Sequence, residues 1–435
     1  MPEFLTLLPP DDAREKLLSH LSGPLAGFDM IDVASSLGRV TAEDIHAPQP
    51  LPDFQRTTVD GYAVRARDTF GATDSMPAYL NLIGEVPMGD SPSFGLDAGQ
   101  CALIHTGGML PKGADAVVML EYTQVVHHEA PGDSQKQDSV ISVAKNPEIE
   151  IFRAVADGEN VIRVGEDVAQ GQLILPRGSR MRPAEIGGLM ALGITSLRVA
   201  TQPRIGLIST GDEVVEPGQK PRPGQVRDIN SYTLGALVEK VGGEAKRYGI
   251  FGDSFAILKD AAAKALAECG AIIITAGSSA STRDMTAEVI RTLGEPGVLV
   301  HGINTRPGKP TILGVCNGKA VIGLPGNPVS ALVNGYLFVV PLIERLLGAL
   351  PKPQSTVQAR LTVNLPSQAG REDWWPVKLK PSPTGRGQGE GFSAEPIFGK
   401  SNLIFTLAFA DGLVRIHPDA TGLSAGEMVD VVLML

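Results

Sequence analysis

The feature that most constrains the fold is an alternation of short apolar runs with helix-like segments between residues 203 and 348. The run "AIIIT" at 271–275, for example, has the length of a buried strand, and a segment with helical spacing follows it. Strands that alternate with helices predict a parallel, doubly wound sheet. We expect strands at 204–209, 245–251, 271–275, 297–303 and 319–324, and helices at 231–243, 254–270, 284–294 and 327–348.

The chain has 435 residues, which is too many for one hydrophobic core, so several domains are expected. Residues 51–149 contain short apolar runs separated by Gly, Pro and Asp, which is typical of a β-module with hairpin turns. This module is inserted into an elongated, discontinuous N-terminal domain made of residues 1–50 and 150–200. The α/β domain at 201–348 follows, and the strand-like text of 349–435 predicts a C-terminal domain resembling a β-barrel.

The formal net charge of -10 argues against a broad surface for DNA or RNA. An anionic ligand would therefore need a local basic pocket. The three cysteines show no spacing typical of a zinc site and fit reduced, buried thiols in a cytoplasmic protein. The N-terminus lacks the pattern of a signal peptide, and no apolar run reaches membrane-spanning length, because "YLFVVPLI" is short and contains a proline. We expect no contact with a membrane.

Ligands of an open parallel sheet bind beyond the carboxyl ends of its strands, so the loops at that edge are the first candidates for a site. These loops read "STGDEVVEPG" (209–218), "FGDS" (251–254), "TAGSSASTRD" (275–284), "NTRPGKP" (304–310) and "GLPGNPVS" (323–330). Taken alone, each could be no more than a tight connection, because short Gly/Pro motifs are common. Together at one edge they favour a binding site.

The loops divide into carboxylates and cations. Asp212, Glu213, Asp253 and Asp284, with a nearby Ser hydroxyl, are oxygen ligands of the kind that Mg²⁺ prefers. The cations Arg306 and Lys309 suit an oxyanion.

The stretch "GLPGNPVSALV" predicts an anion site of another kind. Pro328 stands near the first turn of a helix, which would leave unpaired backbone N–H groups and the positive end of the helix facing the ligand.

Other polar features have simpler explanations. Asp60 in "TTVDGYAV" fits an exposed hairpin turn, and Thr106 lies in a second turn, "HTGG". His127 and His128 are expected to be solvated. The neighbours Trp374 and Trp375 point to opposite faces of a strand, so one is expected in a core and the other at a surface contact.

Taken together, five blocks resemble the signature motifs of the molybdopterin molybdenumtransferase family (MoeA type), which includes the E domain of gephyrin. The resemblance covers nearly the whole chain. The blocks are "VDGYAVRARD", "HTGGMLPKGADAVVMLE", "STGDEV", "RPGKP" and "GLPGNPVSALV".

The resemblance implies a central domain of the molybdopterin-binding type and the insertion of molybdenum from molybdate into adenylylated molybdopterin. The resemblance further implies that AMP is released in a Mg²⁺-dependent step. It also implies a cytoplasmic homodimer of four-domain subunits with active sites at the subunit interface. Transient contacts with other proteins of cofactor biosynthesis and with molybdoenzymes would follow.

The same resemblance assigns roles to residues of this chain. Ser279, Asp284 and Glu213 would bind the metal, and Asp253 would help to hold it with a water. Asp60 and Thr106 would close the site from the partner subunit. The anionic substrates would contact Gly277, Ser279, Arg306, Lys309, Pro325, Asn327, Pro328, Ser330, Arg371 and Ser401.

Two departures from the family pattern leave a second class of function open. Residues 276–284 lack two glycines and one acid that the family commonly carries, and Pro376 stands where the family has an arginine. A non-catalytic carrier or sensor of the pterin cofactor on the same fold is the alternative to the enzyme. A scaffold of the gephyrin kind has less support, because the sequence shows no additional domain.

Overall fold

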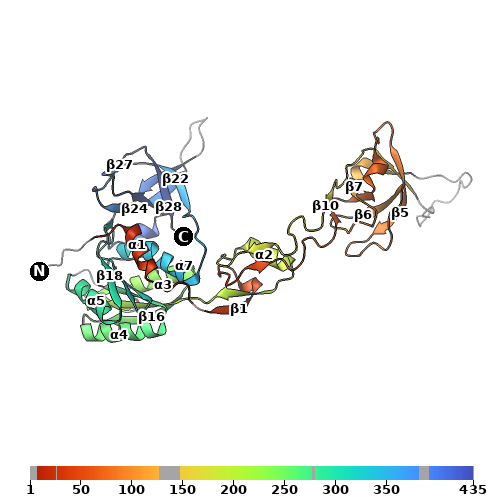
Figure 1. The fold of residues 1–435 in the computed structure, drawn as a ribbon. Coiled ribbons are helices and arrows are strands. Elements are labelled where there is room, and N and C mark those ends of the chain that lie inside the picture. The colour runs from red at the N-terminus through yellow and green to blue at the C-terminus, as the bar shows by residue number, and fades with distance from the viewer. Residues whose placement is uncertain (1–6, 26, 127–146, 277–279, 382–390, 435) are drawn as a thin grey trace, which may run out of the picture. The chain divides into compact units, whose positions relative to one another are not determined.

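The computed structural model describes residues 7–25, 27–126, 147–276, 280–381 and 391–434; for residue 276 and residues 280–284 it describes the backbone alone. The chain forms two compact units, which are described separately (Figure 1). Unit 1 comprises Met1–Glu43, Arg177–Ile186 and Thr195–Leu435. Unit 2 comprises Asp44–Pro176 and Gly187–Ile194.

A six-stranded sheet forms the centre of unit 1, in the order β16-β13-β17-β21-β20-β18. Four neighbouring strands are parallel, as the alternating pattern predicted: β16 (Glu244–Phe251), β13 (Arg204–Thr210), β17 (Ala271–Ala276) and β21 (Lys319–Pro325). The predicted fold class is therefore confirmed for this domain.

The sheet is mixed rather than parallel throughout, because of a strand that the sequence pattern did not reveal. This strand, β20 (Ile312–Cys316), runs antiparallel to both β21 and β18 (Pro296–His301). A tight turn at Asn317 and Gly318, both with positive φ, reverses the chain between β20 and β21. Since β20 opposes both neighbours, β18 points in the same direction as the four parallel strands.

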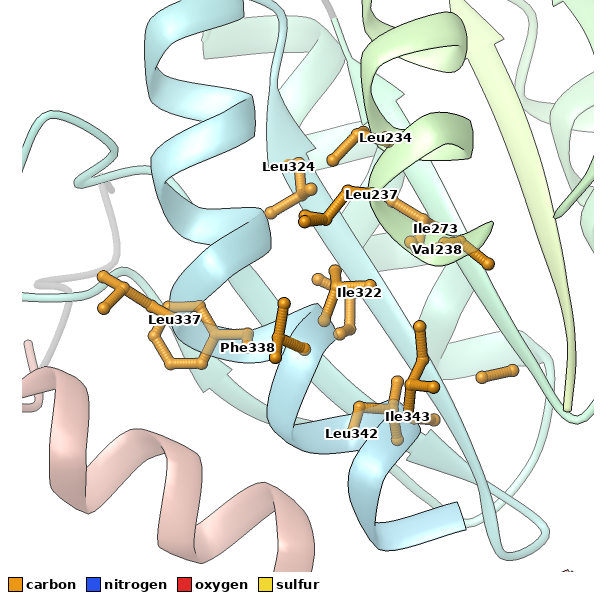
Figure 2. Packing of buried hydrophobic residues seen from close by; sticks show 14 of the residues in the cluster. Leu234, Leu237, Val238, Ile273, Ile322, Leu324, Leu337, Phe338, Leu342 and Ile343 are labelled. Atoms are coloured by element: carbon orange, nitrogen blue, oxygen red, sulfur yellow. The ribbon is translucent and has the colours of Figure 1, made fainter. Parts of the chain in front are cut away.

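Helices cover both faces of this sheet. One face carries α1 (Pro10–Ser19), α3 (Asn230–Lys240), α6 (Pro328–Asn334) and α7 (Val340–Leu347), whose apolar residues form one cluster with the sheet. The other carries α4 (Phe255–Glu268) and α5 (Ala280–Thr292), which pack in a second cluster. Figure 2 shows the first cluster, where Leu237 of α3 and Ile322 of β21 lie near Phe338.

Phe338 belongs to a π-helical segment, η4 (Gly335–Val339), that joins α6 to α7. The resulting helix, Pro328–Leu347, is long and apolar enough to cross a membrane by length and composition, but 72% of its apolar window is buried inside the fold. The helix predicted at 327–348 therefore continues through Pro341, as expected. The wider π-helical turn just before Pro341 accommodates a residue that lacks a backbone N–H.

The C-terminal region of unit 1 is a closed barrel, as predicted. Its strands follow the order β24-β25-β22-β28-β26, and a further pairing of β24 with β26 closes the ring. A short strand from the α/β domain, β19 (Thr305–Arg306), adds to β24 in parallel. The barrel strands are β22 (Thr356–Leu361), β24 (Glu372–Pro381), β25 (Phe392–Pro396), β26 (Gly412–Ile416) and β28 (Met428–Leu433).

Unit 1 also contains a long-range strand pair near the start of the chain. β1 (Phe28–Asp32) pairs antiparallel with β12 (Ser196–Ala200). The two strands are paired although all residues of unit 2 lie between them in the sequence. The remaining elements of unit 1 are η1 (Val33–Ser35), β14 (Val214–Val215), β15 (Val226–Arg227), β23 (Leu365–Pro366), α8 (Phe405–Ala408) and β27 (Gly422–Leu423).

Unit 2 is built on a second six-stranded sheet, in the order β7-β4-β6-β5-β9-β8. Two small strand pairs, β3 with β10 and β2 with β11, accompany it. The elements are β2 (Ile45–His46), β3 (Arg56–Thr57), β4 (Gly61–Val64), η2 (Ala66–Thr69), β5 (Ala78–Val86), β6 (Gln100–Ile104), β7 (Ala116–Met119), η3 (Leu120–Tyr122), β8 (Thr123–Val126), β9 (Glu148–Ile151), β10 (Val161–Ile162) and β11 (Leu173–Leu175). Helix α2 (Pro183–Ala191) spans the boundary between the units. The four-part division at 50, 150, 200 and 348 stays a prediction.

Candidate functional site

The strands of the α/β domain that point in one direction end at one edge of the sheet. In the last rows of the register, Ser209 lies beside Thr275, and Thr275 lies beside Leu324. On the far side, His301 of β18 pairs with Ile312 of β20. The loops that follow β13, β16, β17, β18 and β21 therefore leave the same edge, as the sequence predicted.

Three acidic residues come together in the loops after β13 and β16. The backbone N–H of Asp253 donates to the Asp212 carboxylate at 3.1 Å. Burial raises the pKa of the Asp253 carboxyl, and the charges of Asp212 and Glu213 raise it further. Three carboxylates close together repel one another, and a bound cation would offset this repulsion. Glu213 and Asp253, both predicted site residues, are thus neighbours.

This donor set fits Mg²⁺ in its chemistry, since Mg²⁺ takes hard oxygen ligands. Among the residues whose side chains are described, however, no group of three His, Cys, Asp or Glu is arranged as a closed metal site. The predicted ligand Ser279 and its neighbour Gly277 lie outside the described residues. Asp284 lies in α5, in the stretch where only the backbone is described.

A cavity of about 720 Å³ opens beside the same edge, between the α/β domain and the barrel of unit 1. Within the described part of the chain, four cations line it, Arg306, Lys309, Arg371 and Lys400, against one carboxylate, Asp373. Seven residues predicted to bind the anionic substrates lie in its wall: Arg306, Lys309, Pro325, Asn327, Ser330, Arg371 and Ser401. The structure therefore brings these seven residues together in one basic pocket.

A buried amide holds the cationic loop 306–309 in place. The side-chain N–H₂ of Asn334 in α6 donates to the carbonyl oxygens of Pro307, at 3.1 Å, and Ser330, at 2.8 Å. Gly308 has a φ of +111°, and a Cβ atom at this position would lie 1.7 Å from the Asn334 amide nitrogen. Only glycine fits here, because both its backbone conformation and the space are closed to other residues.

The start of α6 differs from the predicted anion site in one respect. Pro328 is the first helical residue, as expected, but the backbone N–H of Val329 donates to the carbonyl oxygen of Ser401 at 3.0 Å. The expectation of unpaired N–H groups was therefore wrong for this donor. The barrel loop that carries Ser401 packs against the helix start and occupies this N–H, so the Val329 N–H is not available to a ligand.

Trp374 lies in a core, as predicted for one of the two tryptophans, but Trp375 is also partly buried and packs against the core of the barrel. Trp374 is 6% exposed, and its indole N–H donates to the Glu372 carboxylate at 2.7 Å. Trp375 is half-buried, with the guanidinium of Arg306 5.7 Å from its ring centroid. Both line the cavity. Burial raises the pKa of the Glu372 carboxyl, which also accepts from Arg415 at 2.6 Å.

Sequence reasoning missed a buried polar group beneath the sheet edge. The Asp228 carboxylate, 5% exposed, accepts from the hydroxyls of Ser209, at 2.8 Å, and Ser231, at 2.6 Å. The Asn230 amide donates to the carbonyl of Gly326 at 2.8 Å, in the loop after β21. The signal was present as an Asp three residues before a Ser at the start of α3, because such residues cap helices.

In unit 2, the structure brings Asp60 and Thr106 together. The Asp60 carboxylate accepts from the backbone N–H of Thr106 at 2.7 Å and from its hydroxyl at 3.1 Å. These bonds, the backbone one first, hold the pKa of Asp60 below its ordinary value. Both residues are exposed, so their carboxylate and hydroxyl are accessible on the surface of unit 2. His127 and His128, which the sequence predicted to be solvated, lie outside the described residues.

Comparisons with known families agree with this architecture. A model of the MoeA N-terminal region (domain I and II) matches residues 8–193, and a model of the MoeA C-terminal region (domain IV) matches residues 358–434. Between them, the model described as "Probable molybdopterin binding domain" matches residues 206–345.

Individual relatives match over most of their length. A molybdopterin molybdenumtransferase of Haemophilus influenzae is 33% identical over 365 residues, covering 84% of each chain. Molybdopterin molybdenumtransferase 2 of Mycobacterium tuberculosis is 32% identical over 92% of this chain and 94% of its own. The crystal structure of a molybdopterin biosynthesis MoeA protein from Pyrococcus horikoshii superposes with a TM-score of 0.77 at 37% identity, covering 98% of this chain and 99% of that one. The chain therefore belongs to the MoeA-type family of molybdopterin molybdenumtransferases, enzymes of molybdenum cofactor biosynthesis.

Proposed function

We propose that this enzyme inserts molybdenum from molybdate into adenylylated molybdopterin and releases AMP in a Mg²⁺-dependent step. The basic cavity carries this proposal, because four cations against one carboxylate suit a doubly charged oxyanion beside a nucleotide phosphate. A volume of about 720 Å³ falls in the range of small-molecule sites.

The residues of this chain have distinct tasks in the proposed reaction. Arg306, Lys309 and Arg371 bind the anions through charge-assisted hydrogen bonds. Water adds to the phosphorus on the pterin side of the phosphoanhydride and gives up a proton, the bond from that phosphorus to the bridging oxygen breaks, and AMP leaves with the bridging oxygen. The Asp253 carboxyl, whose pKa is raised, is suited to hold the attacking water and its proton.

Mg²⁺ would be held by Glu213 and Asp284, with Ser279, and would supply charge neutralisation at the phosphates. In the proposed homodimer, Asp60 and Thr106 of one subunit would close the site of the other. We also propose that the protein acts in the cytoplasm, where it would transiently contact other proteins of the pathway and the molybdoenzymes that receive the cofactor.

The test is to incubate the purified protein with adenylylated molybdopterin, Mg²⁺ and molybdate and to follow AMP release. We expect Asp284→Asn to abolish turnover and to leave the thermal unfolding midpoint unchanged, because a metal ligand is lost outside the core. The matched control is Asp260→Asn, an exposed residue of α4. Retention of the pterin without any AMP release would favour a carrier or sensor instead.

A further inference from the structure

Among the residues whose side chains are described, a single carboxylate lies in the wall of the basic cavity, and it is bound to one of the four cations. The Asp373 carboxylate accepts two bonds from the Arg371 guanidinium, from Nε at 2.7 Å and from Nη2 at 2.9 Å. Asp373 is 1% exposed, whereas the side chain of Arg371 is 23% exposed. The pair therefore consists of a fixed, buried carboxylate and a guanidinium that reaches the cavity.

The backbone around Asp373 holds it firmly. Asp373 lies in β24 between two partner strands, paired with Arg306 of β19 on one side and with Ile416 of β26 on the other. The same strand pairing thus sets the positions of Asp373 and of the neighbouring cation Arg306. A carboxylate buried in the middle of a sheet has little freedom to follow a moving partner.

The hydrogen bonds of Arg371 leave part of its guanidinium available. A guanidinium has five N–H groups in a rigid plane. Two donate to Asp373, and one on Nη1 donates to the Gln368 side chain at 3.2 Å. Within the described part of the chain, two N–H groups remain for a ligand, and the plane in which they lie is set by Asp373.

Electrostatics alone gives no reason for a carboxylate at this place. A negative charge beside an anion site weakens the attraction of the cavity for its ligand. We propose that Asp373 is a positioning residue, which orients Arg371 so that its two remaining N–H groups bind a tetrahedral, doubly charged oxyanion. This inference deepens the proposed function and rests on its assignment of the cavity to molybdate.

The two explanations of Asp373 predict opposite effects of Asp373→Asn. If the charge dominates, loss of the carboxylate tightens anion binding. If orientation dominates, binding weakens, because an amide oxygen accepts less strongly and the amide N–H₂ repels the guanidinium donors. We expect molybdate to bind about tenfold more weakly, a loss of about 1.4 kcal/mol.

The experiment is titration calorimetry of the full-length protein with molybdate alone. Asp419→Asn serves as the matched control, because it removes the same charge from an exposed site of the barrel outside the cavity wall. We expect unchanged affinity for this control and partial recovery for Asp373→Glu. In turnover, Asp373→Asn should raise the KM for molybdate and leave kcat nearly unchanged. Tighter or equal binding by Asp373→Asn would overturn the proposal.

A second variant covers the case in which Asp373→Asn fails to fold. Arg371→Lys keeps the charge but cannot form the planar, two-bond contact. We expect the same tenfold loss of molybdate affinity, and unchanged affinity would contradict the positioning role. Since molybdate binding is measured without the pterin, the outcome is independent of AMP release. If the two variants lose molybdate affinity as expected but the parent protein releases no AMP, the enzymatic function is rejected and the positioning role stands. If the parent protein releases AMP but the variants bind molybdate as tightly as it does, the enzymatic function stands and the positioning role is rejected.

Discussion

The side-chain amide of Asn334 donates to the carbonyl oxygen of Pro307 at 3.1 Å and so ties the cationic loop 306–309 to the helix that begins at Pro328. Asn334 is completely buried and belongs to none of the loops at the sheet edge. Its contribution is to hold the backbone between Arg306 and Lys309. The geometry of the basic cavity therefore depends on a residue that itself does not line it.

Replacement of this amide should destabilise the protein. Asn334→Ala leaves the partly buried carbonyl of Pro307 and the buried carbonyl of Ser330 without this donor, and we expect the free energy of unfolding to fall by about 1–3 kcal/mol. Urea denaturation measures the change. Asn81→Ala is the control, since Asn81 is exposed and should have an effect below about 0.5 kcal/mol. Equal effects at the two positions would show that the Asn334 bonds contribute no net stability.

Gly308→Ala should disturb the same loop from the other side. A Cβ atom would overlap the Asn334 amide, and the φ of +111° is unfavourable for alanine. We expect a lower thermal midpoint and weaker molybdate binding, because Arg306 and Lys309 flank this residue. Gly218→Ala is the matched control, since a Cβ there meets nothing within 4 Å. A Gly308→Ala variant with the affinity of the parent protein would contradict this account of the loop.

The contact between Thr106 and Asp60 makes a prediction about titration. The backbone N–H of Thr106 contributes most to the lowered pKa of Asp60, and the hydroxyl contributes second. Thr106→Ala should therefore raise the pKa of Asp60 only part of the way toward its ordinary value of roughly 3.9. Carbon-detected NMR of the Asp carboxyls measures it. A return to the ordinary value in Thr106→Ala would mean that the hydroxyl, and not the backbone, is the main donor.

Buried thiols should make stability depend on pH in the alkaline range. Burial raises the pKa of the Cys101 thiol to about 12. For Cys316, burial first and the charge of Glu295 second raise the pKa to about 11. Above the ordinary thiol pKa of roughly 8.5, the unfolded chain ionises while the folded thiols stay neutral, so stability is retained below this pH and falls above it.

The slope for Cys101 should reach about 1.4 kcal/mol per pH unit, and urea denaturation between pH 8 and 10.5 measures it. Cys101→Ala should show a smaller decline with pH than the parent protein. Identical pH profiles for the two proteins would exclude this contribution. In the same range, Cys101 should react with a thiol reagent only after unfolding.

The sequence was informative wherever the signal was local. The spacing of apolar residues identified β13, β16, β17, β18 and β21, and the Gly/Pro loops placed Arg306, Lys309, Asn327 and Ser330 beyond the carboxyl ends of β18 and β21. Strand β20 was missed because a tight turn at Asn317–Gly318, and not a helix, joins it to β21, so it does not fit the alternation of strands and helices.

What the sequence by itself determined is therefore the α/β class, the edge at which the loops gather, and the chemical character of each loop, because these depend on neighbours within a few residues. Only the tertiary structure decided that β19 pairs with β24, so that Arg371 and Ser401 of the barrel share a cavity with Arg306 and Lys309. The same packing attached the carbonyl oxygen of Ser401 to the N–H of Val329. Such contacts depend on which surfaces meet after folding, and residues more than sixty positions apart leave no periodic trace of that choice in the sequence.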